Sequence, residues 1–232
     1  DSTTTTWESF SKLIGEVQKM DFQTFWSICK TMVERSRADS GAQAPSIELL
    51  TMLLDRVYPT GTKKRSSLQE IVERSLYEIF DTVPSFTTGG ESRYRLITWE
   101  GRKSIRQPKG PARILVCRAG GFPSEGIDSP AQLIVHAVRL GWKRIILYDL
   151  RGHRFIGCGM GPKSEGIRID IYGSSGDYVG SGLDGAELIV HGSAQDQAGN
   201  ILKAGKLVIH GDVGQTFMYG AKGGAAFVMG NA

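Results

Sequence analysis

The chain has 232 residues, enough for one large domain or two smaller ones, and no run of 18 apolar residues that would span a membrane. Its formal net charge is +4, and the composition is unusual only in its 30 glycines, most of which follow residue 109. Three widely spaced cysteines, Cys29, Cys117 and Cys158, argue against a disulfide framework or an iron–sulfur cluster held by this chain alone. We therefore expect a reducing, cytoplasmic location, with neither a membrane span nor a signal peptide.

The first 84 residues predict a helical bundle or arm. Apolar side chains recur there at spacings of three and four, which is typical of amphipathic helices. Pro45 fits the first turn of the third helix, and Ser67 with Glu70 resembles a capping box at the start of the fourth. The predicted helices cover residues 7–21, 22–37, 45–58 and 67–83.

Residues 85–112 predict a basic linker. From Arg93 to Arg118 the chain carries eight basic residues against one acid, Glu100. Such a stretch attracts an anionic neighbour, so an anion-binding or nucleic-acid-binding protein is one alternative. Only Tyr94 and Trp99 are interleaved aromatic residues, which makes nucleic acid the weaker partner.

An apolar strand at 113–118 runs into Gly120 and Gly121. This arrangement can cradle a phosphate, but the longer phosphate-binding motif that ends in Lys-Ser/Thr is missing. A helix is then predicted from residue 129 to 140. It is followed by a strand at 144–148, a tight turn at 151–153 and a further extended pair at 155–156. We expect this helix and hairpin to cap the repeats that follow.

The last third of the chain repeats every 19 residues. Gly173, Gly192, Gly211 and Gly230 have this spacing, and apolar residues keep step with them in two columns. The columns are Ile169, Leu188, Leu207, Ala226 and Ile171, Val190, Ile209, Val228. A fixed short period indicates stacked units. With one strand per unit, it predicts a right-handed parallel β-helix with 19-residue coils. Glycines are expected at its turns because the turns need positive φ and because neighbouring coils would crowd a Cβ.

The repeats resemble a known family. The relevant runs are Gly173-Ser-Ser-Gly176-Asp-Tyr-Val-Gly180-Ser-Gly182-Leu-Asp-Gly185, His191-Gly192-Ser-Ala-Gln-Asp196 and His210-Gly211-Asp212-Val-Gly214. They are similar to the Gly-x-Gly-x-Gly β-helix domain at the C-terminus of the glutamate synthase large subunit. That domain also occurs as a separate chain in archaeal-type glutamate synthases and as one of the subunits of formylmethanofuran dehydrogenase. The resemblance covers roughly residues 129–232. It implies a scaffold without catalytic residues, beside partners that hold flavin and iron–sulfur clusters.

One outward column of the repeats predicts a contact surface that is covered by another chain or by this chain's own helices. Ile189, Val208 and Phe227 are large and apolar where polar residues are expected. His191 and His210 share a neighbouring column about 5 Å apart, but that column continues with Tyr172 and Met229, so an outward ladder is favoured over a metal site. The predicted partner-contact residues are Tyr172, Ile189, His191, Val208, His210, Phe227 and Met229.

The sequence contains no recognisable catalytic, cofactor-binding or metal-ligating motif. Cys158 is the best candidate for a reactive thiol, with His153 nearby in sequence, but buried packing is the favoured interpretation. Asp177, Asp184 and Asp196 fit turns in which the carboxylate hydrogen-bonds its own backbone. A free-standing enzyme that uses Cys158 or the histidine pair is therefore the weakest hypothesis.

Together these patterns predict an α+β chain. Residues 1–84 form the helical domain, 85–112 the basic linker, and 113–232 the capped β-helix with an incomplete last coil, so that a further segment or a partner covers its end. The expected function is a non-catalytic scaffold subunit of a glutamate-synthase-like oxidoreductase that docks flavin and iron–sulfur partner subunits. The alternative is the corresponding β-helix component of a formylmethanofuran dehydrogenase complex, with tungsten or molybdenum in a partner.

Overall fold

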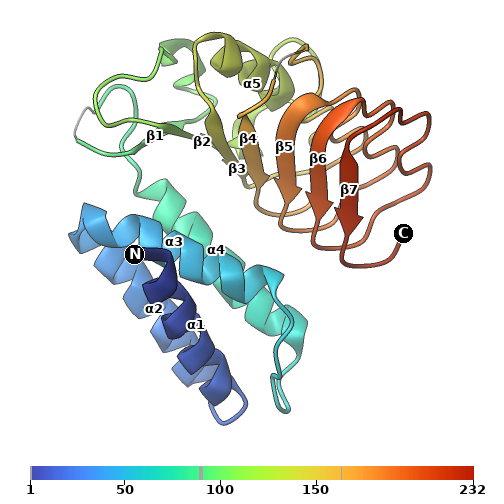
Figure 1. The fold of residues 1–232 in the computed structure, drawn as a ribbon. Helices are drawn as coiled ribbons and strands as arrows, with labels where there is room; N and C mark the ends of the chain where they lie inside the picture. The colour runs from blue at the N-terminus through green and yellow to red at the C-terminus, as the bar shows by residue number, and fades with distance from the viewer. Residues whose placement is uncertain (1, 89–90, 163) are drawn as a thin grey trace. The chain divides into compact units, whose positions relative to one another are not determined.

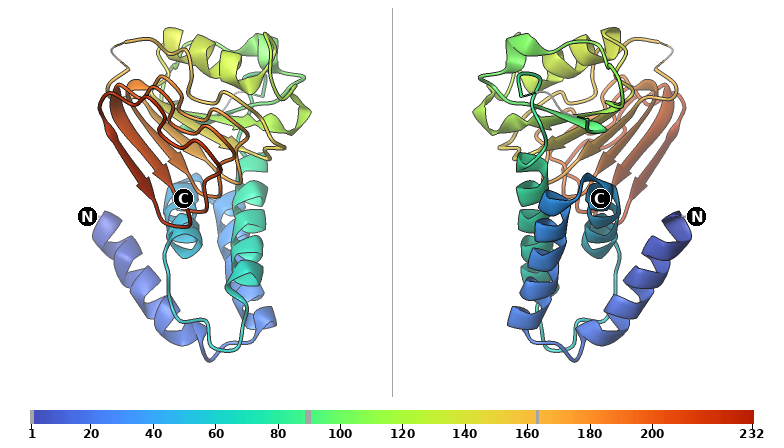
Figure 2. Two further views of the ribbon diagram at one scale, coloured as in Figure 1. Left: turned by 90° about the vertical axis from the view of Figure 1, so that its right-hand side faces the viewer. Right: turned by 90° about the vertical axis from the view of Figure 1, so that its left-hand side faces the viewer.

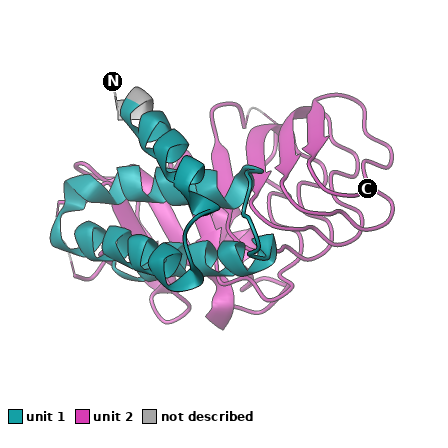
Figure 3. Cartoon of the chain, turned by 90° about the horizontal axis from the view of Figure 1, so that it is seen from below, with its two compact units in different colours: residues 1–82 teal, residues 83–232 magenta. Residues whose placement is uncertain are grey.

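The computed structural model describes residues 2–88, 91–162 and 164–232 (Figure 1). The chain divides into two compact units, Asp1–Thr82 and Val83–Ala232, which are coloured separately in Figure 3. The first is helical. The second holds a parallel sheet and one further α-helix.

The first unit contains the four helices that the sequence predicted. They are α1 (Ser2–Val17), α2 (Phe22–Ala38), α3 (Ser40–Asp55) and α4 (Arg65–Asp81). Helices α2, α3 and α4 pack against one another, and α1 packs on α3. Their apolar stripes bury side chains such as Phe25 and Leu50.

Three predicted helix starts were wrong. Helix α1 begins at Ser2, five residues before the predicted start. Helix α3 begins five residues before Pro45, because the Asp39 carboxylate accepts a hydrogen bond from the Gly41 N–H at 2.8 Å and caps the helix there. Helix α4 begins at Arg65, before the predicted capping box, and its N-cap residue Lys64 makes no side-chain cap hydrogen bond.

The second unit is built on one open sheet of seven parallel strands in sequence order. The strands are β1 (Tyr94–Ile97), β2 (Ile114–Arg118), β3 (Arg144–Tyr148), β4 (Arg168–Ile171), β5 (Asp184–Val190), β6 (Ala204–Ile209) and β7 (Ala225–Val228). Helix α5 (Pro130–Arg139) lies on the connection from β2 to β3. Short 3-10 turns occur at Arg102–Ser104 and Ala119–Gly121. The left view of Figure 2 faces the β7 edge of this sheet.

The predicted right-handed parallel β-helix was therefore wrong, and the fold is α/β with an all-parallel open sheet. Each 19-residue repeat supplies a strand to this one sheet, and the rest of the repeat is turns joined by isolated bridges such as Ser175 with Ala194. The connections before β4 are longer and dissimilar. The prediction failed because a fixed period does not determine how many sheets each repeat enters, and here every repeat contributes one strand to the same sheet.

The predicted cap was also wrong in part. Its helix exists as α5, but Phe155 and Ile156 form no strand, because Phe155 adopts a left-handed φ of 61°. Strand β3 pairs with β2 and β4 in parallel, so α5 belongs to a crossover between strands. Ala131 and Ile134 of α5 share one core with Leu115 and Ile145 of the sheet. Within the segment expected to be a linker, residues 94–97 form β1.

The 19-residue period itself is confirmed. Ile169, Leu188, Leu207 and Ala226 are in register on adjacent strands, and they pack in the core of this unit. Figure 1 shows the four repeated strands side by side.

Close approach explains most of the glycine column. Gly173 has a φ of 102°, but Gly192, Gly211 and Gly230 do not have positive φ. A Cβ at Gly192 would lie 2.4 Å from the Gly173 carbonyl oxygen. Successive turns thus pack backbone on backbone, which leaves no room for a side chain. The predicted crowding of a Cβ by the neighbouring repeat is confirmed at Gly192, Gly211 and Gly230, whereas the predicted positive φ holds only at Gly173.

Candidate docking face of the parallel sheet

Alternate side chains of β4–β7 point to opposite faces of the sheet. One set is the core column described above. The residues that follow the core column by one position on each strand point to the opposite face. We call them the outer row, which contains Asp170, Ile189, Val208 and Phe227 in register on adjacent strands. The alignment predicted for Ile189, Val208 and Phe227 is thus confirmed. Phe227 is 47% exposed at the β7 end of the row.

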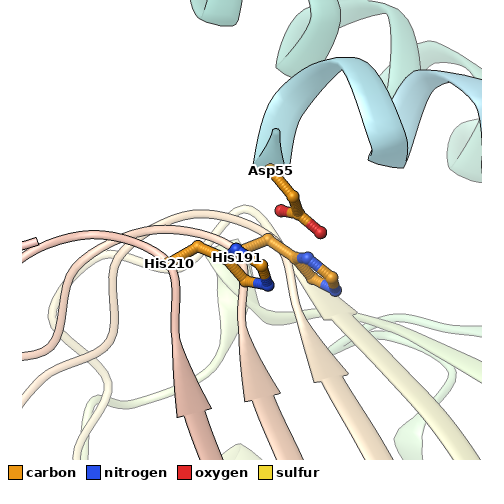
Figure 4. Close-up of side chains that lie close together, drawn as sticks. All are labelled: Asp55, His191 and His210. Carbon is orange, nitrogen blue, oxygen red and sulfur yellow. The ribbon is translucent and has the colours of Figure 1, made fainter. Parts of the chain in front are cut away.

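A second row lies at the carboxyl ends of these strands. We call it the ring row, and it contains Tyr172, His191, His210 and Met229. The Tyr172 and His191 rings stack with centroids 4.3 Å apart and an angle of 18°, and the His191 and His210 rings stack at 5.6 Å and 11°. The predicted spacing of the histidines is confirmed. Figure 4 shows the two imidazoles side by side; Asp55, also labelled there, belongs to the helical unit. Met229 is 60% exposed.

Asp170 links the two rows. Its carboxylate accepts hydrogen bonds from Arg168 Nη2 at 2.7 Å and Arg168 Nε at 3.0 Å. Because a carboxylate can only accept, His191 Nε2 donates the third bond, at 3.2 Å. Burial alone would raise the pKa of Asp170, but these bonds and the Arg168 charge together lower it to about 2. Asp170 is therefore ionised and holds the His191 ring in place.

Charged residues continue along the sheet beside the outer row. Arg168 Nη1 lies 3.5 Å from the Glu187 carboxylate, which also binds Lys206 Nζ at 3.0 Å. The Lys206 ammonium lies 5.9 Å from the centroid of the Phe227 ring. These pairs are partly exposed, so they orient the side chains more than they stabilise the fold.

Asp170 was missed by the sequence reasoning. Only the apolar members of the outward column stood out in the sequence, because an aspartate at an outward position is unremarkable. Extending the same column back by one repeat from Ile189 leads to Asp170, with Arg168 two residues before it on the same face. The 19-residue period was the signal that could have found it.

Cys158 is packed as a thiol. It is half-buried, its Sγ donates to the Tyr178 carbonyl at 3.1 Å, and burial raises its thiol pKa to about 11. The interpretation as a packed cysteine is thus confirmed. Cys29 and Cys117 are likewise free and buried, and burial raises the pKa of each to about 12.

The predicted aspartate turns were wrong. Asp177 Oδ1 accepts from the N–H of Asp196 at 3.2 Å, and Asp196 Oδ1 accepts from the N–H of Gln215 at 2.8 Å. Each carboxylate therefore bonds the next repeat, 19 residues on, rather than its own turn. Asp184 lies at the start of strand β5.

Several arginines of the basic stretch are turned onto the chain itself. Arg95 Nη1 donates to the Tyr94 carbonyl and Arg113 Nη1 to the Gly110 carbonyl. The Arg102 guanidinium lies 3.3 Å from the centroid of the Trp99 ring. The stretch is thus spread over β1, β2 and their connection, where part of its charge is bound locally.

The comparisons with known proteins concern the repeat segment. Residues 149–232 match the family model described as GXGXG motif. No curated protein and no solved structure matches the chain. Among the described residues, no helix combines the length and apolar character needed to cross a membrane. The match confirms the resemblance read from the glycine pattern: residues 149–232 are similar to the GXGXG motif family, the family of the C-terminal domain of the glutamate synthase large subunit.

Proposed function

We propose that this chain is a non-catalytic assembly subunit or domain of a glutamate-synthase-like oxidoreductase. In this proposal it docks partner subunits that carry flavin and iron–sulfur clusters, in a reducing, cytoplasmic compartment. The family match of residues 149–232 supports the class of parent enzyme. The docking role rests on the surface of the sheet.

The observation that carries the docking role is the exposed end of the outer and ring rows. Phe227 and Met229, both more than two-fifths exposed, continue rows that hold large side chains on every repeat. A β-sheet face that meets only water normally alternates to polar residues at such positions. Exposed, contiguous apolar side chains are typical of a protein contact surface.

The helical unit also exposes large aromatic side chains. Trp7 of α1, and Phe22 and Trp26 of α2, are each more than 40% exposed. Tryptophan and other aromatic residues are enriched at the centres of protein interfaces. The proposal therefore assigns contact surfaces to both units.

The test is native purification of the full chain, tagged, with its complex, followed by mass spectrometry and assays for flavin, iron, molybdenum and tungsten. The wild type should bring down a flavoprotein and iron–sulfur protein in fixed ratio. Phe227→Asp should weaken that association by about tenfold, because it buries a charge at the contact.

Ile201→Asp is the matched control. Ile201 is also exposed, in a turn with a φ of 57°, which aspartate tolerates. It should leave the complex intact. Loss of the complex in both variants, or in neither, would contradict docking at the β7 end. A partner with molybdenum or tungsten and no flavin would contradict the glutamate-synthase class.

A further inference from the structure

Positive charge is concentrated where strands β1, β2 and β3 begin (Figure 1). Arg93, Arg113 and Lys143 each stand one residue before the start of one of these strands, and the register of the sheet places them side by side. Neighbouring strands lie about 4.8 Å apart, so the backbones of the three residues span about 10 Å. All three side chains are exposed.

The loop that leads into β2 adds further cations to the same place. It lies against the start of β3, because Trp142 Nε1 donates a hydrogen bond to the Arg106 carbonyl at 2.7 Å. A Cβ added at Gly141 would also lie 3.9 Å from Pro108 Cδ of this loop. The exposed side chains of this loop and of the three strand starts form what we call the basic edge, which contains Arg93, Arg106, Lys109, Arg113, Lys143 and Arg144.

The charges of the basic edge have no acidic partner among the described residues. The salt bridges of this unit join other side chains, for example Arg118 and Asp149. Arg113 donates to two backbone carbonyls, which carry no net charge. Two acids precede strands at this edge, Glu91 before β1 and Glu165 before β4, but both are exposed and neither forms an ion pair with it in the described part of the chain. Six cations therefore face solvent together without a counter-charge.

The field of the basic edge is felt by the Tyr94 phenol on β1. Burial raises the pKa of this phenol, while the charges of Arg93 and Arg144 act in the opposite direction. Arg93 precedes β1 and Arg144 begins β3, so guanidinium groups from two different strands act on one position. Like charges gathered in this way repel one another, and an anionic surface placed over them relieves that repulsion.

We propose that the basic edge binds an acidic face of a partner protein. Arginine and lysine side chains form charge-assisted hydrogen bonds with carboxylates, and arginine is enriched at protein interfaces. Single-stranded nucleic acid is less suitable, because the Tyr94 and Trp142 rings at this edge are only 5% and 1% exposed and cannot stack on bases. The inference rests on the proposed role as an assembly subunit, and it adds a contact surface apart from the exposed end of the outer row at Phe227.

The experiment is cross-linking of the full chain in its purified, nuclease-treated complex with a carbodiimide, which joins a lysine amine directly to a carboxylate. Peptide mass spectrometry then identifies the joined residues. We expect Lys109 and Lys143 to be joined to aspartate or glutamate residues of a partner chain. Lys203 is the internal control, because it is also exposed and also directly precedes a strand, β6, but lies three strands away from Lys143. It should form no such cross-link.

Charge reversal supplies the second measurement. Lys143→Glu should weaken the affinity for the cross-linked partner by about tenfold, because an attractive charge becomes a repulsive one, and the difference should narrow as ionic strength is raised. Lys203→Glu changes the net charge equally and should leave the affinity unchanged.

Three results would overturn the proposal. They are equal weakening by both variants, cross-links of Lys109 and Lys143 that reach only acids of this chain or none at all, and loss of the partner on nuclease treatment. The proposed function would survive the second of these results if a partner with flavin and iron–sulfur clusters remained bound, so the two can fail separately.

Discussion

The two halves of the parallel sheet are built differently. From β4 to β7 the connections follow one 19-residue pattern, and side chains bond the same position of the next repeat, as Asp177 does with the N–H of Asp196. From β1 to β3 the connections differ, and one of them contains α5. Repetition yields rows of like residues on a continuous face. Irregular connections bring basic residues from separate segments together at one edge.

Among the substitutions that test this difference, the largest loss of stability is expected where the backbones of two repeats approach closely. Gly192→Ala places a Cβ 2.4 Å from the Gly173 carbonyl oxygen, which is backbone and cannot rotate away. We expect a loss of about 3 kcal/mol in the free energy of unfolding, measured by urea denaturation.

Gly182→Asn is the control for this substitution. Gly182 has a φ of 70°, but a Cβ added there would meet no heavy atom of the described residues within 4 Å, and asparagine tolerates that backbone conformation. Its cost should be below about 1 kcal/mol. Similar losses at both sites would contradict the view that packing between repeats sets the glycine column.

A smaller loss of stability is expected at Asp170, the one charged residue of the outer row. The folded pKa of Asp170 is about 2, below the ordinary value of 3.8, so its ionised form stabilises the fold above about pH 4. Asp170→Asn should lower the free energy of unfolding by about 2 kcal/mol at pH 7. This difference should shrink as the pH falls from about 4 to 2, as measured by denaturation across that range.

Asp184→Asn, which removes a carboxylate of β5 outside the Arg168 and His191 network, is the control for the loss of a carboxylate as such. If the loss caused by Asp170→Asn stayed constant down to pH 2, the network would not act through the ionised carboxylate.

The smallest change in stability is expected at the turns between the repeated strands. Tyr178, Gln197 and Thr216 are spaced by 19 residues and share a φ near 60°, where side chains are disfavoured. Thr216 is exposed and β-branched. Thr216→Asn should therefore raise the free energy of unfolding by about 1 kcal/mol, seen as a higher melting temperature. A decrease would mean that the threonine makes a compensating contact.

The sequence predicted local elements better than their assembly. Four helix stripes, helix α5 and the register of Leu188 with Leu207 follow from apolar spacing, which is a local property. The β-helix did not follow, because period alone does not say how many sheets each repeat enters. The early strand β1 was hidden in a basic segment, where its short alternation was read as part of a linker.

The outer row could be predicted only in part, for a similar reason. Ile189, Val208 and Phe227 stood out because they are apolar at outward positions. Asp170 did not, and neither did the full grouping of the basic edge. The partners of Asp170 lie two and 21 residues away, and the basic edge draws on separate segments between residues 93 and 144. Such contacts depend on strand order, which no local pattern contains.

The ladder of side chains that bind the following repeat has a consequence for how this architecture changes over evolution. Ser193 holds the N–H of Asp212, and Asp212 holds that of Asn231, always 19 residues on. Insertion or deletion of one whole repeat keeps every such donor opposite an acceptor, whereas a change of any other length shifts all later positions out of step. The repeated half is therefore expected to grow or shrink among homologues in complete modules, while the connections between β1 and β3 are free to vary one residue at a time.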